Sequence, residues 1–178
     1  ILDGIRAFIG AEVIKRHEEH RDLFDSPHDL YERDGRFNPK VLGLLREVRM
    51  ASADAGFYTM FAQKAFGGAE LGASLLYSVY ETIFRICGPN YWLGWHMIGH
   101  WAKGPSQTLA HVNDAVRESI LPALMSGEAS MCFAMSEPDA GTDVWSMTTT
   151  AVRDGNGWAL SGIKQWITNG PYSEYTLV

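Results

Sequence analysis

In the first part of the chain, apolar residues recur every three or four positions. The first set with this spacing is Ile1, Ile5, Phe8, Ile9 and Val13. Such spacing predicts an amphipathic helix that buries one face. The charged segment 15–22 that follows predicts a solvated end to this helix.

Two more helices are predicted before residue 90. Asn38 can cap a helix and Pro39 suits a first helical turn, so a helix is expected to begin here. Its apolar positions are Val41, Leu42, Leu45 and Val48, and Gly56 is its predicted stop. The next helix is expected over about 74–87, where Gly88 and Pro89 end it.

A further helix is predicted between a cap at Asn113 and Asp114 and a stop at Gly127. Its apolar positions are Ala115, Ile120, Leu121 and Leu124. Pro122 lacks a backbone N–H and predicts that the regular helix kinks or ends early.

From Ala129 onward the pattern changes from helical to extended. The apolar run 131–135 predicts a buried strand, and segments 148–152 and 158–162 predict a hairpin around the turn 153–157. Helices followed by antiparallel strands favour an α+β chain with two separate units. We expect a helical domain over residues 1–127 and the first part of a β domain over 128–178.

Two polar segments follow strands and are candidates for a binding site. The first runs from Ser136 to Asp143 and contains hydroxyls, carboxylates and Gly141, which lets backbone N–H groups turn toward an anion or a carbonyl. The second is predicted to end a strand at 166–170, where Trp166 and Thr168 meet a turn. An aromatic face beside hydroxyls suits a planar cofactor, although the first segment alone could be a capped surface turn.

Other candidate motifs are weaker. The glycine-rich segment 66–72 lacks the spacing of a phosphate loop, so a turn that enters the next helix is favoured. His96 and His100 are four apart and would share a helix face, as metal ligands do, but no third ligand is evident. We therefore predict core or pocket-lining histidines and no metal site.

Composition excludes several classes of function. The net charge of −6 argues against a nucleic-acid partner, although a local basic pocket for a polyanion such as CoA stays open. No apolar run reaches the roughly 18 residues of a membrane span. Cys87 and Cys132 lie in apolar segments without metal-like spacing, which predicts buried thiols in a reducing compartment.

The two ends of the chain suggest part of a longer protein. The sequence begins with Ile1 rather than methionine and stops inside the apolar run 175–178. Its start also lacks the basic region and apolar run of a secretory signal.

The two candidate segments resemble a known family. Ala134-Met-Ser-Glu-Pro-Asp-Ala-Gly-Thr-Asp143 and Gly162-Ile-Lys-Gln-Trp-Ile-Thr-Asn-Gly170 are similar to the two flavin-binding segments of acyl-CoA dehydrogenases. The first matches the family signature at every restricted position, including Ser146, and the second follows at the expected distance. Two such matches in order are far more specific than one.

The resemblance implies an architecture and a reaction. The family has an N-terminal helical domain, a middle antiparallel β-barrel-like domain and a C-terminal helical bundle, of which this chain would hold the first and only the opening strands of the second. The implied reaction is FAD-dependent α,β-dehydrogenation of an acyl-CoA thioester to the trans-2-enoyl-CoA. A base removes the α proton while hydride leaves the β carbon for FAD.

The resemblance also assigns site residues. The implied FAD-binding residues are Phe133, Met135, Ser136, Gly141, Thr142, Trp166, Ile167 and Thr168. Among them, Trp166 would cover the flavin ring, Thr168 would place its hydroxyl near flavin N5, and Thr142 would approach the cofactor diphosphate or the substrate pantetheine. Glu137 and Asp143 are interpreted as shaping the loop, with an acid and base pair as the alternative. Trp92, Trp95 and Trp101 are either acyl-specificity residues or buried packing.

The catalytic residue is not assigned within this chain, because the family's base lies in the C-terminal bundle. The resemblance implies a homodimer or homotetramer that passes electrons to an acceptor such as an electron-transfer flavoprotein in fatty acid β-oxidation. It implies a cytoplasmic location in a bacterium or the mitochondrial matrix in a eukaryote. Alternatives are an acyl-CoA oxidase, a nitroalkane oxidase, a flavin monooxygenase, or a non-catalytic subunit of an acyl-CoA dehydrogenase complex.

Overall fold

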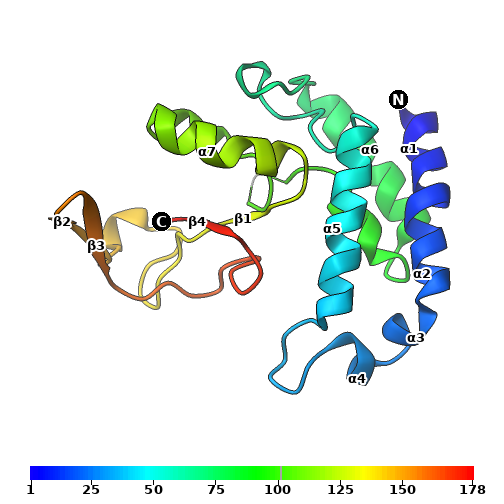
Figure 1. Cartoon of the computed structure of the whole chain (residues 1–178), viewed down its shortest axis with the longest axis horizontal. Coiled ribbons are helices and arrows are strands. Elements are labelled where there is room, and N and C mark those ends of the chain that lie inside the picture. The colour runs from blue at the N-terminus through cyan, green and yellow to red at the C-terminus, as the bar shows by residue number, and fades with distance from the viewer. Residues whose placement is uncertain (101) are drawn as a thin grey trace.

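The computed structural model describes residues 1–100 and 102–178 and places helices before strands along the chain (Figure 1). The N-terminal elements pack side by side, and the strands lie at the other end of the molecule beside α7. Thus a helical region followed by β-strands is the architecture, as the sequence pattern predicted.

The chain begins with one helical rod. Its parts are α1 (Leu2–Phe8), a π-helical stretch (Ile9–Ile14) and α2 (Lys15–Glu19), followed by the short helices α3 (Arg21–Phe24) and α4 (Pro27–Leu30). Ile5, Ile9 and Val13 are fully buried, which confirms the predicted buried face, whereas Ile1 is exposed.

The charged segment 15–22 is not solvated throughout, contrary to the prediction. His17 is buried, and its ring lies 4.0 Å from that of Phe24. The His17 Nε2 atom accepts a hydrogen bond from the Leu93 N–H at 3.2 Å. One turn beyond Val13, His17 continues the buried face of the rod, which explains why a polar residue lies inside.

Helices α5 (Pro39–Asp54) and α6 (Ala73–Cys87) confirm the predicted second and third helices. The Asn38 side chain accepts a hydrogen bond from the Lys40 N–H at 2.9 Å. Gly56 follows α5 with φ +78° and Gly88 follows α6 with φ +50°, a conformation that favours glycine.

The main core lies among α1, the π-helical stretch, α5 and α6. Its fully buried members include Ile5, Ile9, Val13, Val41, Val48, Val79, Ile83, Leu93 and Met97. Burial of each large aliphatic side chain contributes about 1.5–3 kcal/mol, so this core is the main source of stability in the helical region. Cys87 and Cys132 are both buried free thiols, as predicted.

Helix α7 (Asp114–Met125) departs from the prediction at its end. Pro122 does not end it early, because the helix continues to Met125. The proline removes one hydrogen bond to the carbonyl of Glu118, an exposed residue whose carbonyl water can hydrate. The predicted cap and stop are present, since Asn113 accepts from the Val116 N–H at 2.9 Å and Gly127 has φ +73°.

The strands form two separate pairs. In the antiparallel hairpin, β2 (Thr150–Asp154) pairs with β3 (Gly157–Ser161), as predicted. In contrast, β1 (Met131–Phe133) pairs with β4 (Tyr175–Leu177) in parallel, so the expectation of antiparallel strands fails for this pair. The segment 134–174 between them, which includes the hairpin, is long enough for a parallel crossover.

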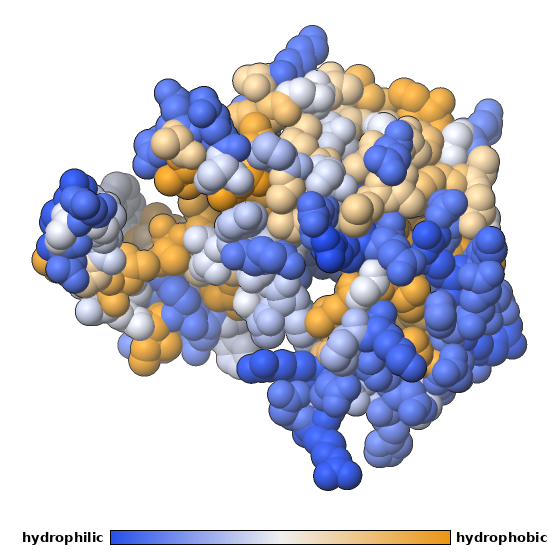
Figure 2. All heavy atoms as spheres, viewed as in Figure 1, coloured by the Kyte–Doolittle hydropathy of each residue, from blue (hydrophilic) through white to orange (hydrophobic). Residues whose placement is uncertain are grey.

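A second core joins the strands to α7. It is formed by Leu109, Leu124, Ala129 and Met131, against which Tyr175 and Leu177 of β4 pack. In Figure 2 hydrophilic residues cover the side formed by α2, α3 and α4, whereas apolar residues are exposed around the strands. Within the described ranges, no helix is long and apolar enough to span a membrane.

Candidate functional site

The loop after β1 is built around a buried carboxylate. Glu137 and Ala140 exchange backbone hydrogen bonds across a tight turn, with the Glu137 N–H donating at 2.8 Å. The Glu137 carboxylate accepts from the Thr148 N–H at 2.6 Å, from the Thr149 N–H at 3.0 Å and from Lys164 Nζ at 2.9 Å. These contacts hold the loop, the start of the hairpin and the second segment together.

The carboxylates of Glu137 and Asp143 both bind groups of the loop itself. Hydrogen bonds from Thr149, Lys164 and Thr148 hold the pKa of the Glu137 carboxyl well below its usual range, so it stays ionised. Asp143 accepts from the Trp145 N–H at 3.2 Å and from the Ser146 hydroxyl at 2.6 Å. An ionised, fully bonded Glu137 is a poor acid or base, which favours the loop-shaping interpretation.

The second candidate segment lies directly against the first. Lys164 Nζ donates to the Met135 carbonyl at 3.0 Å, and the Gln165 N–H donates to the Ser136 carbonyl at 3.0 Å. The Asn169 amide donates to the Ser130 hydroxyl and the Met131 carbonyl, both at 3.0 Å. Residues about thirty positions apart in sequence therefore form one continuous site.

The predicted strand into Trp166 is absent, because β3 ends at Ser161 and irregular backbone follows. Trp166 has φ +59° and Asn169 has φ +68°. Asparagine tolerates this conformation, but for tryptophan it is strained. Trp166 is 87% exposed, so the segment presents a large aromatic side chain to solvent rather than burying it.

The structure groups some of the predicted cofactor residues and separates others. Phe133, Met135 and Ser136 are half-buried on β1 and its exit, next to the segment that carries Trp166 and Ile167. Gly141 and Thr142 lie further along the loop and are exposed. Gly141 has no positive φ, and a Cβ there would meet nothing within 4 Å, so the turn itself does not require glycine.

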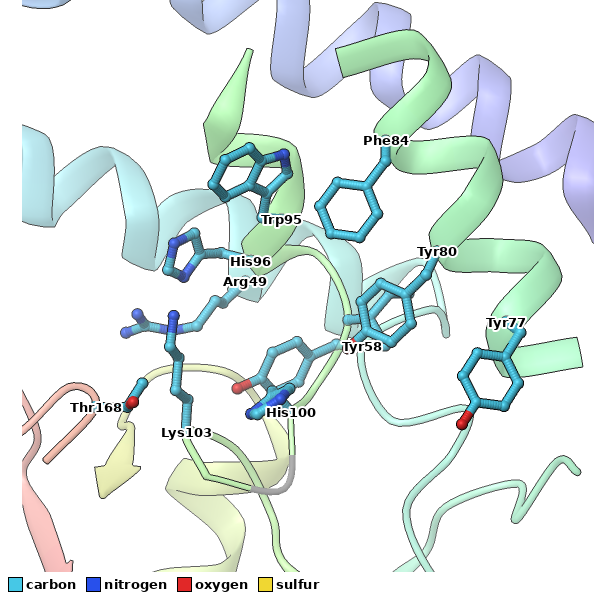
Figure 3. A pocket seen from close by; sticks show the side chains of 11 residues that line it. Arg49, Tyr58, Tyr77, Tyr80, Phe84, Trp95, His96, His100, Lys103 and Thr168 are labelled. Atoms are coloured by element: carbon cyan, nitrogen blue, oxygen red, sulfur yellow. The ribbon is translucent and has the colours of Figure 1, made fainter. Parts of the chain in front are cut away.

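A cavity of about 490 Å³ opens beside Thr168 (Figure 3). Besides Thr168, its lining comes from α5, the segment after α5, α6 and the segment after α6: Arg49, Tyr58, Tyr77, Tyr80, Phe84, Trp95, His96, Ile98, His100 and Lys103. Aromatic side chains of α6 lie on one side of the view, and Arg49, His96, Lys103 and Thr168 lie on the other. A hydroxyl of the second segment therefore faces the same space as the helical region.

His96 and His100 line this cavity, as predicted, but they do not share a helix face. A 3₁₀ helix covers Trp92–His96 and the chain then leaves the helix, so the four-residue spacing has no helical meaning. Burial, with the nearby charge of Lys103, lowers the pKa of His96 to about 3. No group of acidic, His or Cys side chains in the described parts of the chain is arranged to hold a metal ion.

The tryptophans of segment 91–101 have different surroundings, since one packs in the core and another lines the cavity. Trp92 packs against Phe24 and Phe37 with ring centroids 5.8 and 5.5 Å away. Trp95 lines the cavity and is 42% exposed. Trp101 lies outside the described residues.

The glycine-rich segment 66–72 is a turn, as predicted. The Glu70 N–H donates to the Ala62 carbonyl at 2.9 Å, and a Cβ on Gly68 would lie 2.1 Å from that same oxygen. Close backbone approach therefore explains this glycine. The sequence analysis did not single out Arg49, Tyr58 or Lys103. A signal was available for Lys103, which is the one Asp, Glu, Lys or Arg between Arg85 and Asp114.

Comparison with known proteins gives one family. A family model described as "Acyl-CoA dehydrogenase, middle domain" matches residues 132–178. The mitochondrial isovaleryl-CoA dehydrogenase of Pongo abelii is 37% identical over 134 residues, which is 75% of this chain and 31% of that protein. The cyclohexane-1-carbonyl-CoA dehydrogenase of Geobacter metallireducens is 35% identical over 145 residues, which is 81% of this chain and 35% of that protein.

Solved structures share the fold across nearly the whole chain. Glutaryl-CoA dehydrogenase from Mycobacterium smegmatis matches with a TM-score of 0.64 at 23% identity, covering 99% of this chain and 40% of that one. An acyl-CoA dehydrogenase complexed with FAD from Bacillus anthracis matches with a TM-score of 0.63 at 24% identity, covering 99% and 27%.

This chain spans about a third of the length of the curated relatives it matches. Its helices correspond to the region that precedes the middle domain, and its strands fall within the stretch matched by the middle-domain model. The chain belongs to the acyl-CoA dehydrogenase family, in which it corresponds to the N-terminal helical region and the start of the middle domain.

Proposed function

We propose that this chain is the N-terminal part of an FAD-dependent enzyme that converts an acyl-CoA thioester to the trans-2-enoyl-CoA. The observation that carries the proposal is the joining of the two segments, which presents the exposed Trp166 ring and sets Thr168 at a cavity. Residues 1–127 form the helical domain and residues 128–178 begin the β domain in this proposal.

The residues present fit a flavin. A strained Trp166 that stays exposed is costly unless something stacks on it, and such strain concentrates at binding sites. A planar ring would cover that face, as aromatic cofactor sites require. Ser136 and Thr168 supply hydroxyls for the polar edge of the ring, and Phe133, Met135 and Ile167 supply apolar contact.

Bound FAD would accept the hydride that leaves the β carbon of the acyl group. Within this chain, Trp166 would orient the ring, and the Thr168 hydroxyl would form a hydrogen bond with its polar edge. Thr142 and Gly141, both exposed on the loop, would bind the cofactor diphosphate or the substrate pantetheine. The base that removes the α proton belongs to a part of the protein outside these residues.

The finer biology follows from the same proposal. The partners are the acyl-CoA substrate, a second copy of the subunit in a homodimer or homotetramer, and an electron acceptor such as an electron-transfer flavoprotein. The location is the bacterial cytoplasm, or the mitochondrial matrix in a eukaryote. The role is an oxidation step of acyl-CoA breakdown.

An anaerobic titration of the complete purified flavoprotein tests the reaction. Acyl-CoA thioesters are added without oxygen while the absorbance of the oxidised flavin is recorded. Bleaching by a thioester is expected. A yellow protein that no thioester bleaches would contradict the dehydrogenase proposal, and a colourless protein that cannot be reconstituted with FAD would contradict the flavin site.

Replacement of Lys164 tests the flavin site without turnover. Lys164→Met removes the two hydrogen bonds from Nζ that join the segments, so Trp166 and Thr168 lose their fixed position. Loss of charged hydrogen bonds of this kind predicts an FAD Kd raised about tenfold or more. The Kd is measured by quenching of flavin fluorescence on titration of apoprotein. Lys40→Met, on an exposed turn of α5, is the matched control, and equal Kd values in both variants would contradict the site.

A further inference from the structure

The cavity beside Thr168 contains three basic side chains from three different segments. Arg49 extends from α5, His96 ends the 3₁₀ helix Trp92–His96, and Lys103 lies in the segment before α7. Figure 3 shows their nitrogen atoms gathered at one side of the cavity, near Thr168. The same three residues also line an adjoining cavity of about 260 Å³.

Arg49 and Lys103 have no carboxylate partner in the described ranges. Their side chains form no ion pair there, and the hydrogen bond found for the Arg49 side chain is from Nε to the Gly127 carbonyl at 3.0 Å. The nearest acidic neighbour on the second cavity, Glu174, already accepts from the Ser130 N–H at 2.6 Å and its hydroxyl at 3.1 Å.

Other shielded cations of this chain are paired. Arg16 binds the carboxylates of Glu12 and Glu47, and Lys164 binds Glu137 at 2.9 Å. A buried charge is costly unless it is paired and hydrogen-bonded. Arg49 and Lys103 therefore differ from Arg16 and Lys164 in forming no ion pair among the described residues, and the charge of Glu174 acts on Arg49 only from beyond ion-pair distance.

The basic residues of the cavity lower one another's pKa values. Burial, together with the charge of Arg49, lowers the pKa of Lys103. His96 is neutral near pH 7, since its pKa is lowered to about 3. The positive charge thus resides on Arg49 and Lys103, and an anion between them would reverse this unfavourable repulsion.

The opposite wall is apolar. Tyr77, Tyr80 and Phe84 of α6 line it, and the Tyr80 and Phe84 ring centroids are 5.9 Å apart. Trp95 lies beside His96 and meets Phe84 with ring centroids 5.6 Å apart (Figure 3). Such a cavity suits a ligand with an apolar body and one negative group. A phosphate-rich group such as the CoA diphosphate would leave these aromatic walls without a partner.

We propose that this cavity receives the acyl group of a thioester whose far end carries a carboxylate, bound by Lys103 and Arg49. The inference rests on the proposed function and names its substrate class. The methylene chain lies along the α6 aromatics, and the carboxylate forms the ion pair that Lys103 and Arg49 do not have within the described chain. Charge-assisted hydrogen bonds to Lys103 and Arg49 then discriminate such a chain from one that ends in a methyl group.

Matched thioesters test the proposal on the complete flavoprotein. Glutaryl-, adipyl- and pimelyl-CoA are each compared with the monocarboxylic acyl-CoA of equal chain length, by kcat/KM with an artificial electron acceptor and by Kd under anaerobic conditions. The CoA part is identical within each pair, so only the terminal carboxylate differs. We expect a preference of about tenfold or more for at least one dicarboxylic member, as a hydrogen bond to a charged group predicts.

Lys103→Met is the decisive variant, because its ammonium group has no hydrogen bond to another described residue that folding would lose. The preference should fall to near unity through loss of kcat/KM with the dicarboxylic thioesters, while the FAD content of the protein stays unchanged. Lys40→Met should keep the preference. Arg49→Gln gives a second measurement, although Arg49 also bonds to Gly127.

The outcomes separate this inference from the proposed function. If no thioester bleaches the flavin, the proposed function itself fails. If monocarboxylic thioesters react as well as or better than their partners, the dehydrogenase stands and the carboxylate site is refuted. A preference that Lys103→Met leaves intact, or a variant that loses FAD instead, would likewise overturn the assignment of Lys103.

Discussion

The helical region and the β2–β3 hairpin are both well-formed secondary structure, but they are held by different forces. The helices bury a continuous core in which Ile9 and Ile83 are inaccessible to solvent. Every residue of β2 and β3 is exposed, and Trp158 and Leu160 are 61% and 56% accessible. The hairpin is therefore defined by its ladder and turn, whereas the helices are defined by packing.

This contrast shows what a local pattern does and does not specify. A turn at Gly155, with φ +55°, and alternating β-branched residues are enough to fix the hairpin register. They do not determine what its apolar side chains contact. Within the hairpin, the Arg153 guanidinium over the Trp158 ring at 5.3 Å is one side-chain contact that crosses the strands.

The largest expected effect comes from truncating one aliphatic side chain in each region. Ile83→Ala leaves a cavity in the core and should lower the free energy of unfolding by about 2–5 kcal/mol. Leu160→Ala removes a side chain that is already exposed and should change it by less than about 0.5 kcal/mol. Urea denaturation followed by circular dichroism measures both. A cost for Leu160→Ala equal to that of Ile83→Ala in the complete protein would show that another part of it covers the hairpin.

The fold was largely predictable because its signals are local. Caps at Asn38 and Asn113 and glycine stops at Gly56 and Gly127 each act within one helical turn, so they appear directly in the sequence. The parallel pairing of β1 with β4 depends on contacts across more than forty residues. No local pattern contains that information, and the antiparallel expectation failed there.

The candidate site was predictable only where its residues are adjacent in sequence. The segments around Ser136 and Thr168 were found from their composition and resemblance, and the structure places them side by side. Arg49 and Lys103 meet only through packing of α5 against the later segment, so neither stood out. Their role as an anion site stays a proposal.

A smaller effect is expected from the buried imidazole of the packed region. Burial lowers the pKa of His17 to about 4 from 6.5, so the unfolded chain binds a proton that the folded chain does not between these values. The contribution of His17 to the free energy of unfolding should be fully present above pH 6.5. It should be lost as the pH drops toward 4, by up to about 3 kcal/mol.

His17→Gln tests that pH dependence. The free energy of unfolding is measured by denaturant titration at several pH values between those two limits, and the slope against pH should be shallower in the variant. Because burial also lowers the pKa of His96, part of the slope of stability against pH should persist in this variant. His20→Gln, on an exposed residue near the same helix end, should keep the full slope. An unchanged slope in His17→Gln would mean that His17 is charged or solvated in the folded protein.

The smallest effect on the free energy of unfolding is expected at Gly141 in the loop, in contrast to Gly127, which follows α7. Gly127 has φ +73°, and a Cβ there would lie 2.7 Å from the Arg49 backbone, so Gly127→Ala should destabilise clearly. At Gly141 the space is open and φ is not positive, so Gly141→Ala should change the free energy of unfolding by less than about 0.5 kcal/mol.

The informative measurement for Gly141→Ala is therefore FAD affinity rather than stability. If Gly141 approaches the cofactor diphosphate as proposed, the added methyl group should raise the FAD Kd with no loss of stability. An unchanged Kd would place the diphosphate elsewhere and leave the glycine without a role in binding.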